Sequence, residues 1–421
     1  MNRSISRIAI ATGTALALAL AGCSSGDDAG ANGGKTVLTV SLWNYASTPE
    51  FKALVEGFEA EHPDIDVQPV DILADDYAKK VTTMLAGGDT TDVITMKNVT
   101  DYARYGTRGQ LAPLTDEANK LDKNAYLGLD PFNLDGKYFA LPYRSDFWLL
   151  YYNKKLLKDS GLDLTNLTWQ DYAQLAKAST AGSGTDKVYG TYQHVWRSVV
   201  QAIAAAQTGG NLLGGDYAFM SGQYTMALDL EKSGATLPWG TAFTQKVSYN
   251  TMFSTGKAAM LPMGTWYAAA LLQAKADGKS TVDWGIAPLP QVTKDGKVTT
   301  FGSPTAFAIN KKAKHAEAAK QFVLWASGEK GATTIAKIGV TPAYHSAAIT
   351  DAYFSVTGMP NDTLAKKAFQ PDKVVLEMPV SEKSSDVDAI LTEEHQLIMT
   401  GSKSVSAGIA EMGKRVKSEV D

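Results

Sequence analysis

The sequence predicts an α/β protein in which helices cover the faces of sheets with parallel strands. Short β-branched segments alternate with amphipathic helical segments near the N-terminus, and a second such series begins near residue 147. Alternation of strand and helix is typical of parallel sheets, because parallel neighbours need a crossover connection. The 421 residues, 44% of them hydrophobic and 20% charged, are enough for two or three globular folding units.

The first series runs strand, helix, strand, helix, strand. Residues 36–44 are rich in β-branched and other apolar side chains, as a strand requires. Phe51, Leu54 and Phe58 recur at helical spacing, and Pro63 stops that helix. The expected elements are strands at 36–44, 65–70 and 92–96 and helices at 49–62 and 76–87.

The second series is longer and richer in helix. It opens with the apolar strand 147–153. Gly302-Ser303-Pro304 predicts a turn just before a strand at 305–310, because Gly and Pro interrupt regular elements. The other expected elements are helices at 154–160, 168–180 and 314–326, a helix-rich stretch at 194–274, a strand at 283–289 and a mostly helical end at 386–420.

Charge and cysteine content exclude several classes of function. The 40 Lys and Arg residues against 44 Asp and Glu give a net charge of −4, so no basic surplus is present to bind nucleic acid. One cysteine excludes an internal disulfide, a cysteine-rich zinc site and an iron–sulfur cluster, and five scattered histidines disfavour a metal centre. No phosphate-binding or metalloprotease motif is present. We therefore expect no cofactor and no metal.

Residues 1–22 have the pattern of a secretory signal peptide, with a basic start and an apolar run too short to remain as a membrane span. At the end of this run, Leu20-Ala21-Gly22-Cys23 resembles a bacterial lipobox, which implies cleavage before Cys23 and a diacylglyceryl group on its sulfur. Residues 23–35 are then a flexible Gly/Ser/Asp tether that holds the protein on the outer face of the cell membrane. The alternative is that Cys23 is a buried core residue.

Four segments carry a family resemblance. They are GGDTTDVI at 87–94, GKYFALPY at 136–143 with LYYNK at 150–154, FSTGKAAM at 253–260 with MGTW at 263–266, and GIAPLP at 285–290. They resemble, in order, a helix-to-strand turn with Thr91 in place of the usual proline, a first crossover between lobes, a helix–strand–turn, and a second crossover. The family consists of the extracellular solute-binding proteins of ABC importers, and the similarity is to its maltose-binding-protein-like sugar-binding group.

This resemblance implies two α/β lobes joined by crossover strands. Lobe one would comprise residues 36–143 plus 291–342, and lobe two residues 144–290 plus 343–421. The ligand would lie between the lobes and close them by a hinge. The resemblance also implies delivery of the ligand to ABC permease subunits in the membrane and no catalytic activity. We expect a monomer that binds an oligosaccharide.

Candidate ligand-binding residues follow from the chemistry of sugars, which present C–H faces to aromatic rings and hydroxyls to planar polar groups. Trp266 follows Gly264 at a predicted strand end and matches the family's stacking tryptophan. Asp146 matches the position of an acidic ligand-binding residue of the family, although a salt bridge with Arg144 is the alternative. In open α/β sheets, ligands bind beyond the carboxyl ends of the strands. The further candidates are Asn44, Tyr45, Ser47, Lys97, Asn98, His194, Trp196, Tyr267, Ser303 and Glu377.

Several alternatives remain open at this stage. Because a strand alternates faces, only one of Phe147 and Trp148 can share the ligand side, and Tyr267 is as suited to packing as to binding. The ligand of an importer protein can also be a peptide or a polyol. A surface-tethered glycoside hydrolase would need two carboxylates facing each other across the substrate, for example those of Asp146 and Glu377.

Overall fold

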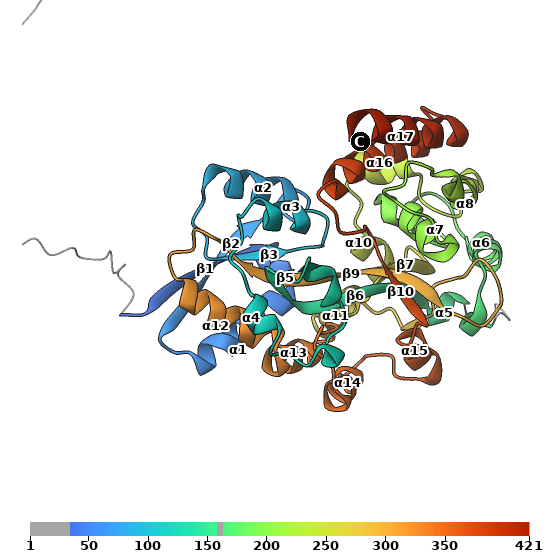
Figure 1. Ribbon diagram of the computed structural model, residues 1–421. Helices are drawn as coiled ribbons and strands as arrows, with labels where there is room; N and C mark the ends of the chain where they lie inside the picture. The colour runs from blue at the N-terminus through green and yellow to red at the C-terminus, as the bar shows by residue number, and fades with distance from the viewer. Residues whose placement is uncertain (1–33, 158–162, 421) are drawn as a thin grey trace, which may run out of the picture.

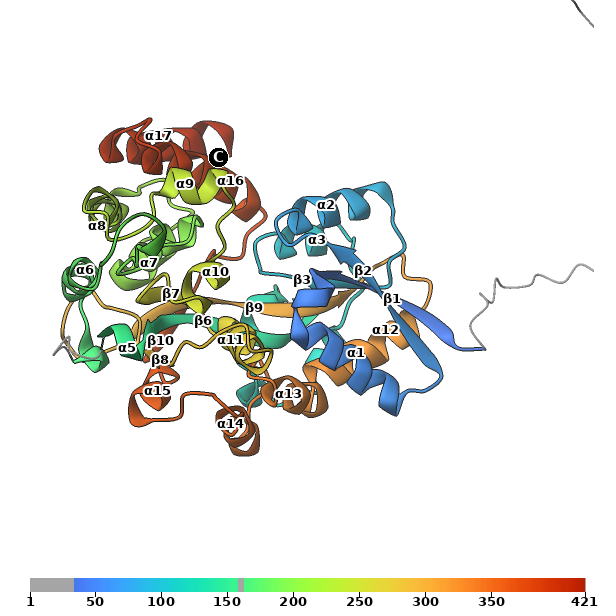
Figure 2. The same ribbon diagram turned by 180° about the vertical axis from the view of Figure 1, so that it is seen from behind.

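The structure is a computed structural model that describes residues 34–157 and 163–420. The predicted signal peptide 1–22, Cys23 and all but the end of the tether 23–35 lie outside the described residues. Two lobes of strands and helices are joined by long strands in the middle of the molecule (Figures 1 and 2). This arrangement confirms the predicted two-lobed α/β fold.

Lobe one is built around three parallel strands near the N-terminus. Strand β1 pairs in parallel with both β2 and β3, and its inward residues Leu38 and Val40 are completely buried. Helices α2 and α3 cover one face of this sheet, and α1 and α12 cover the other (Figure 1). The elements are β1 (Thr36–Trp43), α1 (Pro49–Glu61), β2 (Ile65–Ile72), α2 (Tyr77–Gly87), β3 (Val93–Met96), α3 (Tyr102–Thr107), α4 (Thr115–Ala118), β4 (Asn133–Leu134), β5 (Lys137–Tyr138), α12 (Ala316–Ser327) and α13 (Glu329–Ala336).

Two long antiparallel strands connect the lobes. Strand β6 (Ala140–Asn153) pairs with β9 (Thr299–Ile309) from Ala140 opposite Ala308 to Phe147 opposite Gly302. The far end of β6 pairs with β7 (Met260–Gly264) and β8 (Trp284–Ala287) in lobe two, whereas β9 reaches β3 in lobe one and β10 (Lys373–Leu376) in lobe two. The sheet is therefore mixed rather than parallel throughout, with the order β2-β1-β3-β9-β6-β7 along its main path.

The prediction of a turn at residues 302–304 is wrong, because these residues lie inside β9. Ser303 is paired with Asp146 and Pro304 with Ser145 of β6. A Cβ atom on Gly302 would lie 2.0 Å from the carbonyl oxygen of Asp146, so this glycine permits a close approach of two strands instead of a turn. The segment 285–290, which resembles the second crossover, lies in lobe two, and β9 is the strand that passes between the lobes.

A β-bulge interrupts β6 where it leaves lobe one. The register shifts between Pro142 and Arg144, so that Tyr143 is the extra residue. Its ring stacks on Phe307 of β9 with ring centroids 4.5 Å apart. Because a bulge changes the face on which the following residues point, it sets the direction of Arg144 and Asp146.

Lobe two contains most of the helices and two groups of buried apolar residues. One group packs around β6, β7 and β8. The other lies between α7, α8 and the C-terminal helices α16 and α17. The elements are α5 (Lys154–Leu157), α6 (Trp169–Ala178), α7 (Gln201–Thr208), α8 (Ser221–Lys232), α9 (Trp239–Thr244), α10 (Tyr249–Ser254), α11 (Tyr267–Ala276), α14 (Ala347–Phe354), α15 (Thr363–Ala368), α16 (Ser384–Met399) and α17 (Val405–Glu419).

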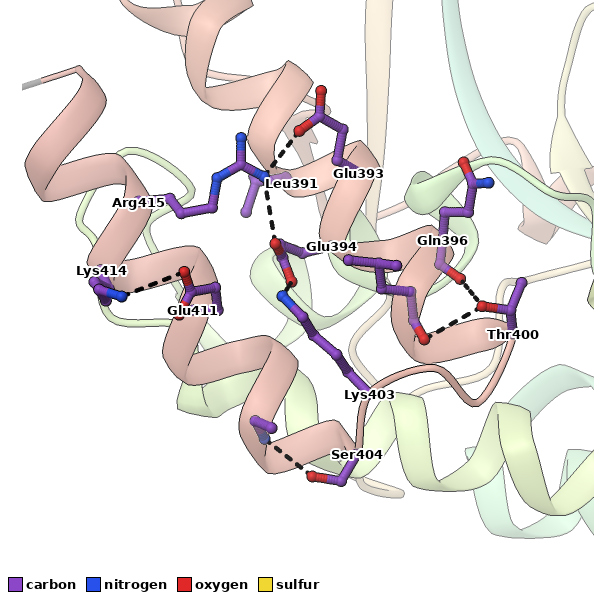
Figure 3. Close-up of polar contacts among 12 residues, drawn as sticks. Leu391, Glu393, Glu394, Gln396, Thr400, Lys403, Ser404, Glu411, Lys414 and Arg415 are labelled. Atoms are coloured by element: carbon purple, nitrogen blue, oxygen red, sulfur yellow. Dashed lines mark hydrogen bonds and ion pairs between the residues drawn. The ribbon is translucent and has the colours of Figure 1, made fainter.

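A network of charged residues joins α16 to α17 (Figure 3). The side chain of Glu394 on α16 is 2% exposed, and its carboxylate pairs with Lys403 at 2.6 Å and with Arg415 of α17 at 3.3 Å. Arg415 also pairs with Glu393 at 2.8 Å. A buried carboxylate needs such partners, because an unpaired buried charge is strongly destabilising.

Residues 34–157 and 163–420 contain no helix with the length and apolar character needed to cross a membrane. Within the same ranges, no group of three or more His, Cys, Asp or Glu side chains is arranged to hold a metal ion.

Candidate functional site

Five side chains of lobe two form an aromatic cluster beside the crossover strands. Trp266, after β7, lies 5.9 Å from Trp148 of β6 and 6.3 Å from Trp196 between ring centroids. Trp196 also contacts His194 at 4.5 Å and Tyr249, at the start of α10, at 5.8 Å. Trp148 is buried, whereas the other four side chains are half-buried. The cluster therefore combines one buried residue, Trp148, with four residues that keep part of their surface accessible.

Local sequence explains how Trp266 is held. Strand β7 ends at Gly264, and the ring of Trp266 folds back over it, so a Cβ atom on Gly264 would lie 1.7 Å from the indole. Strand alternation explains why Trp148, and not Phe147, belongs to the cluster. Phe147 points the other way and contacts Phe369.

Burial changes the protonation of the polar member of the cluster. It lowers the pKa of His194 from 6.5 to about 4, because an imidazolium is poorly solvated among aromatic rings. His194 is therefore neutral near pH 7, and each ring nitrogen can take part in a hydrogen bond as either donor or acceptor, depending on the tautomer.

A buried ion triad of Glu50, Arg144 and Asp146 lies at the junction of the lobes. Arg144 pairs with Glu50 at the start of α1, and its Nε lies 2.6 Å from Asp146. The side chain of Glu50 is 4% exposed, that of Arg144 9% and that of Asp146 3%. Burial raises the pKa of both carboxyl groups, although the guanidinium opposes that effect. The salt bridge between Arg144 and Asp146, the structural alternative for Asp146, is therefore present.

The triad contacts residues of both lobes. The Arg144 guanidinium lies over the ring of Trp43, at the end of β1, 5.8 Å from its centroid. Asp146 accepts a hydrogen bond from the Thr265 hydroxyl at 2.8 Å and another from the backbone N–H of Trp266. Trp43 in lobe one and Trp266 in lobe two are thus linked through two charged side chains.

Lys97 lies on the lobe-one side of this junction. Its ammonium donates to the Ala74 carbonyl at 2.7 Å and lies 5.5 Å from the ring centroid of Trp43. Burial lowers the pKa of Lys97 to about 8, an effect opposed by the charges of Asp75 and Glu377. Glu377 is held in lobe two by a hydrogen bond from the Ser198 hydroxyl. A basic side chain of lobe one and an acidic side chain of lobe two therefore lie near enough to influence each other.

The pKa of Lys97 predicts a pH dependence of stability. Between its folded value of about 8 and its ordinary value of 10.5, the unfolded chain binds a proton that the folded protein has released, so stability rises with pH. Relative to Lys97→Met, the wild type should gain up to about 3 kcal/mol across this window. Urea denaturation followed by circular dichroism at several pH values measures the difference. If the free energy of unfolding changes with pH in the same way for the two proteins, the lowered pKa of Lys97 is contradicted.

The polar candidates in the loops after β1 and β3 have local structural partners. Asn44 has a left-handed backbone (φ 45°), and its side-chain oxygen accepts from the Ala74 amide at 3.1 Å. The exposed Ser47 hydroxyl donates to the Asn44 carbonyl, and Asn98 accepts from the amide of Thr100. The Tyr45 amide donates to Asp71. These four residues lie in the loops but do not join the aromatic cluster.

Ser303 and Tyr267 occupy different environments. Ser303 is half-buried in β9, opposite Asp146. Tyr267 has no exposed surface, packs its ring on Tyr151 at 5.2 Å, and its hydroxyl donates to Asn250 at 3.2 Å. Its side chain therefore belongs to the core of lobe two, as the packing alternative predicted.

Two aromatic residues near the junction of the lobes, Trp43 and Tyr249, are absent from the candidates predicted from the sequence. Trp43 is the last residue of β1 and directly precedes the polar candidates Asn44, Tyr45 and Ser47. Tyr249 opens a short helix in the middle of a helix-rich stretch, and only tertiary packing brings it to Trp196. A strand-end tryptophan was a usable signal, whereas Tyr249 had none.

Two lobes joined by crossover strands, with aromatic and charged groups gathered at their junction, define a two-lobed binding protein. A family model for bacterial extracellular solute-binding proteins matches residues 45–333. The chain belongs to this family, and its place is therefore outside the cytoplasm.

Individual relatives agree with this assignment. The structure of a sugar transporter from Rhizobium etli, in an open conformation, is 34% identical with a TM-score of 0.75, covering 91% of this chain and 99% of that one. The arabinooligosaccharide-binding protein of Bacillus subtilis is 24% identical over 335 residues, 75% of this chain and 74% of that protein. The mannitol-binding protein of Pseudomonas aeruginosa is 24% identical over 355 residues, 79% of each.

Proposed function

We propose that this protein captures an oligosaccharide between its two lobes and delivers it to the permease subunits of an ABC importer. The observation that carries the proposal is the aromatic cluster, in which Trp196, Tyr249 and Trp266 are half-buried, and not fully buried, beside the crossover strands. Several accessible rings fit a ligand with several sugar units, because each unit presents a C–H face. Relatives described as an arabinooligosaccharide-binding protein and a sugar transporter support a sugar as the ligand.

The charged groups around the cluster complete the proposed site. Lys97 from lobe one and Glu377 from lobe two supply a donor and an acceptor for sugar hydroxyls. We also retain Asn44, Tyr45, Ser47, Asn98, His194 and Ser303 as proposed contacts in the closed form. Closure about β6 and β9 would bring the two sets together, and the ligand would favour closure by binding the closed form more tightly.

The attachment and assembly of the protein form part of the same proposal. The lipobox-like sequence supports cleavage of residues 1–22 and lipidation of Cys23, so that a monomer is held at the outer face of the cell membrane near its permease. Two acyl chains are enough for stable anchoring. The site acts by binding alone, and the ligand leaves it chemically unchanged.

A thermal-shift screen of residues 24–421 tests the substrate class. We expect an arabinooligosaccharide or a maltodextrin to stabilise the fold by about 2.7 kcal/mol at 100 times its dissociation constant, and chromatography to recover the sugar intact. Mannitol and a tripeptide serve as the competing ligands, since a mannitol-binding relative exists. Stabilisation by mannitol or the peptide alone would overturn the oligosaccharide. Shortened sugar products would indicate a hydrolase.

A further inference from the structure

We propose that Arg144 is a positioning residue that sets the orientation of the aromatic rings of both lobes, acting on Trp43 directly and on Trp266 through Asp146. The proposal rests on the proposed function, in which Trp266 is a sugar platform and Lys97, beside the Trp43 ring, is a sugar contact. Neither Arg144 nor Asp146 needs to touch the ligand for this role.

The position of Arg144 in the chain places it between the lobes. It follows the bulge residue Tyr143, on the strand that passes from lobe one to lobe two. Its guanidinium pairs with Glu50 of α1 and donates to the Thr305 hydroxyl of β9 at 3.2 Å. The Thr305 hydroxyl in turn donates to the Lys97 carbonyl at 3.2 Å. A single side chain thus connects α1, both crossover strands and the exit of β3.

The connection to Trp266 runs through Asp146. One carboxylate oxygen lies 2.6 Å from Arg144, and the other accepts from Thr265 at 2.8 Å. The backbone N–H of Trp266 also donates to this carboxylate. These contacts fix the turn after β7, and the Trp266 ring is then confined because it lies over Gly264. Since the Asp146 side chain is only 3% exposed, its protein partners leave it almost no free surface for a sugar.

The chemistry of arginine is needed for this arrangement. A planar guanidinium offers five N–H donors in a fixed fork, whereas an ammonium is a point charge on a flexible stem. The substitution Arg144→Lys would keep a cation near the carboxylates, but the ammonium would not reach Glu50, Asp146 and Thr305 together. Asp146→Asn would keep the shape and one acceptor but would lose the charge that holds Arg144.

Near-UV circular dichroism of the unliganded protein tests the positioning directly. Asp146→Asn should change the tryptophan bands, and that change should vanish in a Trp266→Phe background. Arg144→Lys should also change the tryptophan bands. That change should become smaller in a Trp43→Phe background and in a Trp266→Phe background. The matched control is Arg415→Lys, because Arg415 also holds a buried carboxylate but joins two helices of one lobe (Figure 3). Unchanged bands in folded Asp146→Asn and Arg144→Lys proteins would overturn the proposal.

Calorimetry with the sugar found by the screen gives the second readout. Asp146→Asn should raise the dissociation constant on the order of tenfold in the wild-type background and by less than twofold or so when Trp266 is already alanine. Equal losses in both backgrounds would show that Asp146 acts independently of Trp266. If no sugar binds the wild type, the proposed function fails, while the dichroism measurement still decides the role of Arg144.

Discussion

Replacement of Trp266 by alanine is expected to weaken sugar binding by about 2 kcal/mol or more, which corresponds to a roughly 30-fold rise in the dissociation constant. The indole is half-buried and touches both Trp148 and Trp196, so it offers a flat face whose orientation is fixed before the ligand arrives. A platform of this kind binds with little loss of side-chain freedom. Isothermal titration calorimetry with the best sugar of the screen gives the affinity.

The control for this variant is Phe354→Ala. Phe354 is also a half-buried aromatic residue of lobe two, but it lies at the end of α14 and packs on Tyr353 and Phe369. Its loss should lower stability without altering affinity. An unchanged affinity in the Trp266→Ala protein would assign the indole to packing and would remove the main support for a sugar platform.

Local patterns were sufficient to predict the elements near the N-terminus. The strand expected at 36–44 is Thr36–Trp43, and the helix expected at 49–62 is Pro49–Glu61. In both cases the information lies within the segment, as β-branched residues or as apolar spacing closed by Pro63. The same applies to the turn after β7, where Gly264 and Trp266 are two residues apart.

Long-range pairing explains what local patterns missed. Strand β9 begins at Thr299 and not at residue 305, because Gly302, Ser303 and Pro304 are held extended by β6. A glycine and a proline signal a turn when no partner is known. The site follows the same rule, since Tyr249 reaches Trp196, and Arg144 reaches Glu50, only through tertiary packing.

Gly302→Ala is expected to destabilise the protein by about 3 kcal/mol. The new Cβ atom would lie 2.0 Å from the Asp146 carbonyl oxygen and 2.9 Å from the Cα atom of Phe147. Both neighbours belong to the backbone of β6, so they cannot rotate away as a side chain can. Movement of β9 in the other direction is also restricted, because Gly302 pairs with Leu376 of β10. Urea denaturation followed by far-UV circular dichroism gives the change in the free energy of unfolding.

Gly222→Ala is the matched control, since its new Cβ in helix α8 meets no atom within 4 Å apart from its chain neighbours and the backbone of its own helix. That variant should be neutral or more stable by up to about 1 kcal/mol, because alanine favours the helix. A Gly302→Ala protein as stable as the Gly222→Ala protein would mean that the two crossover strands are further apart than described. The connection between the lobes would then rest on fewer backbone contacts, and the position of Asp146 beside Arg144 would lose its main constraint.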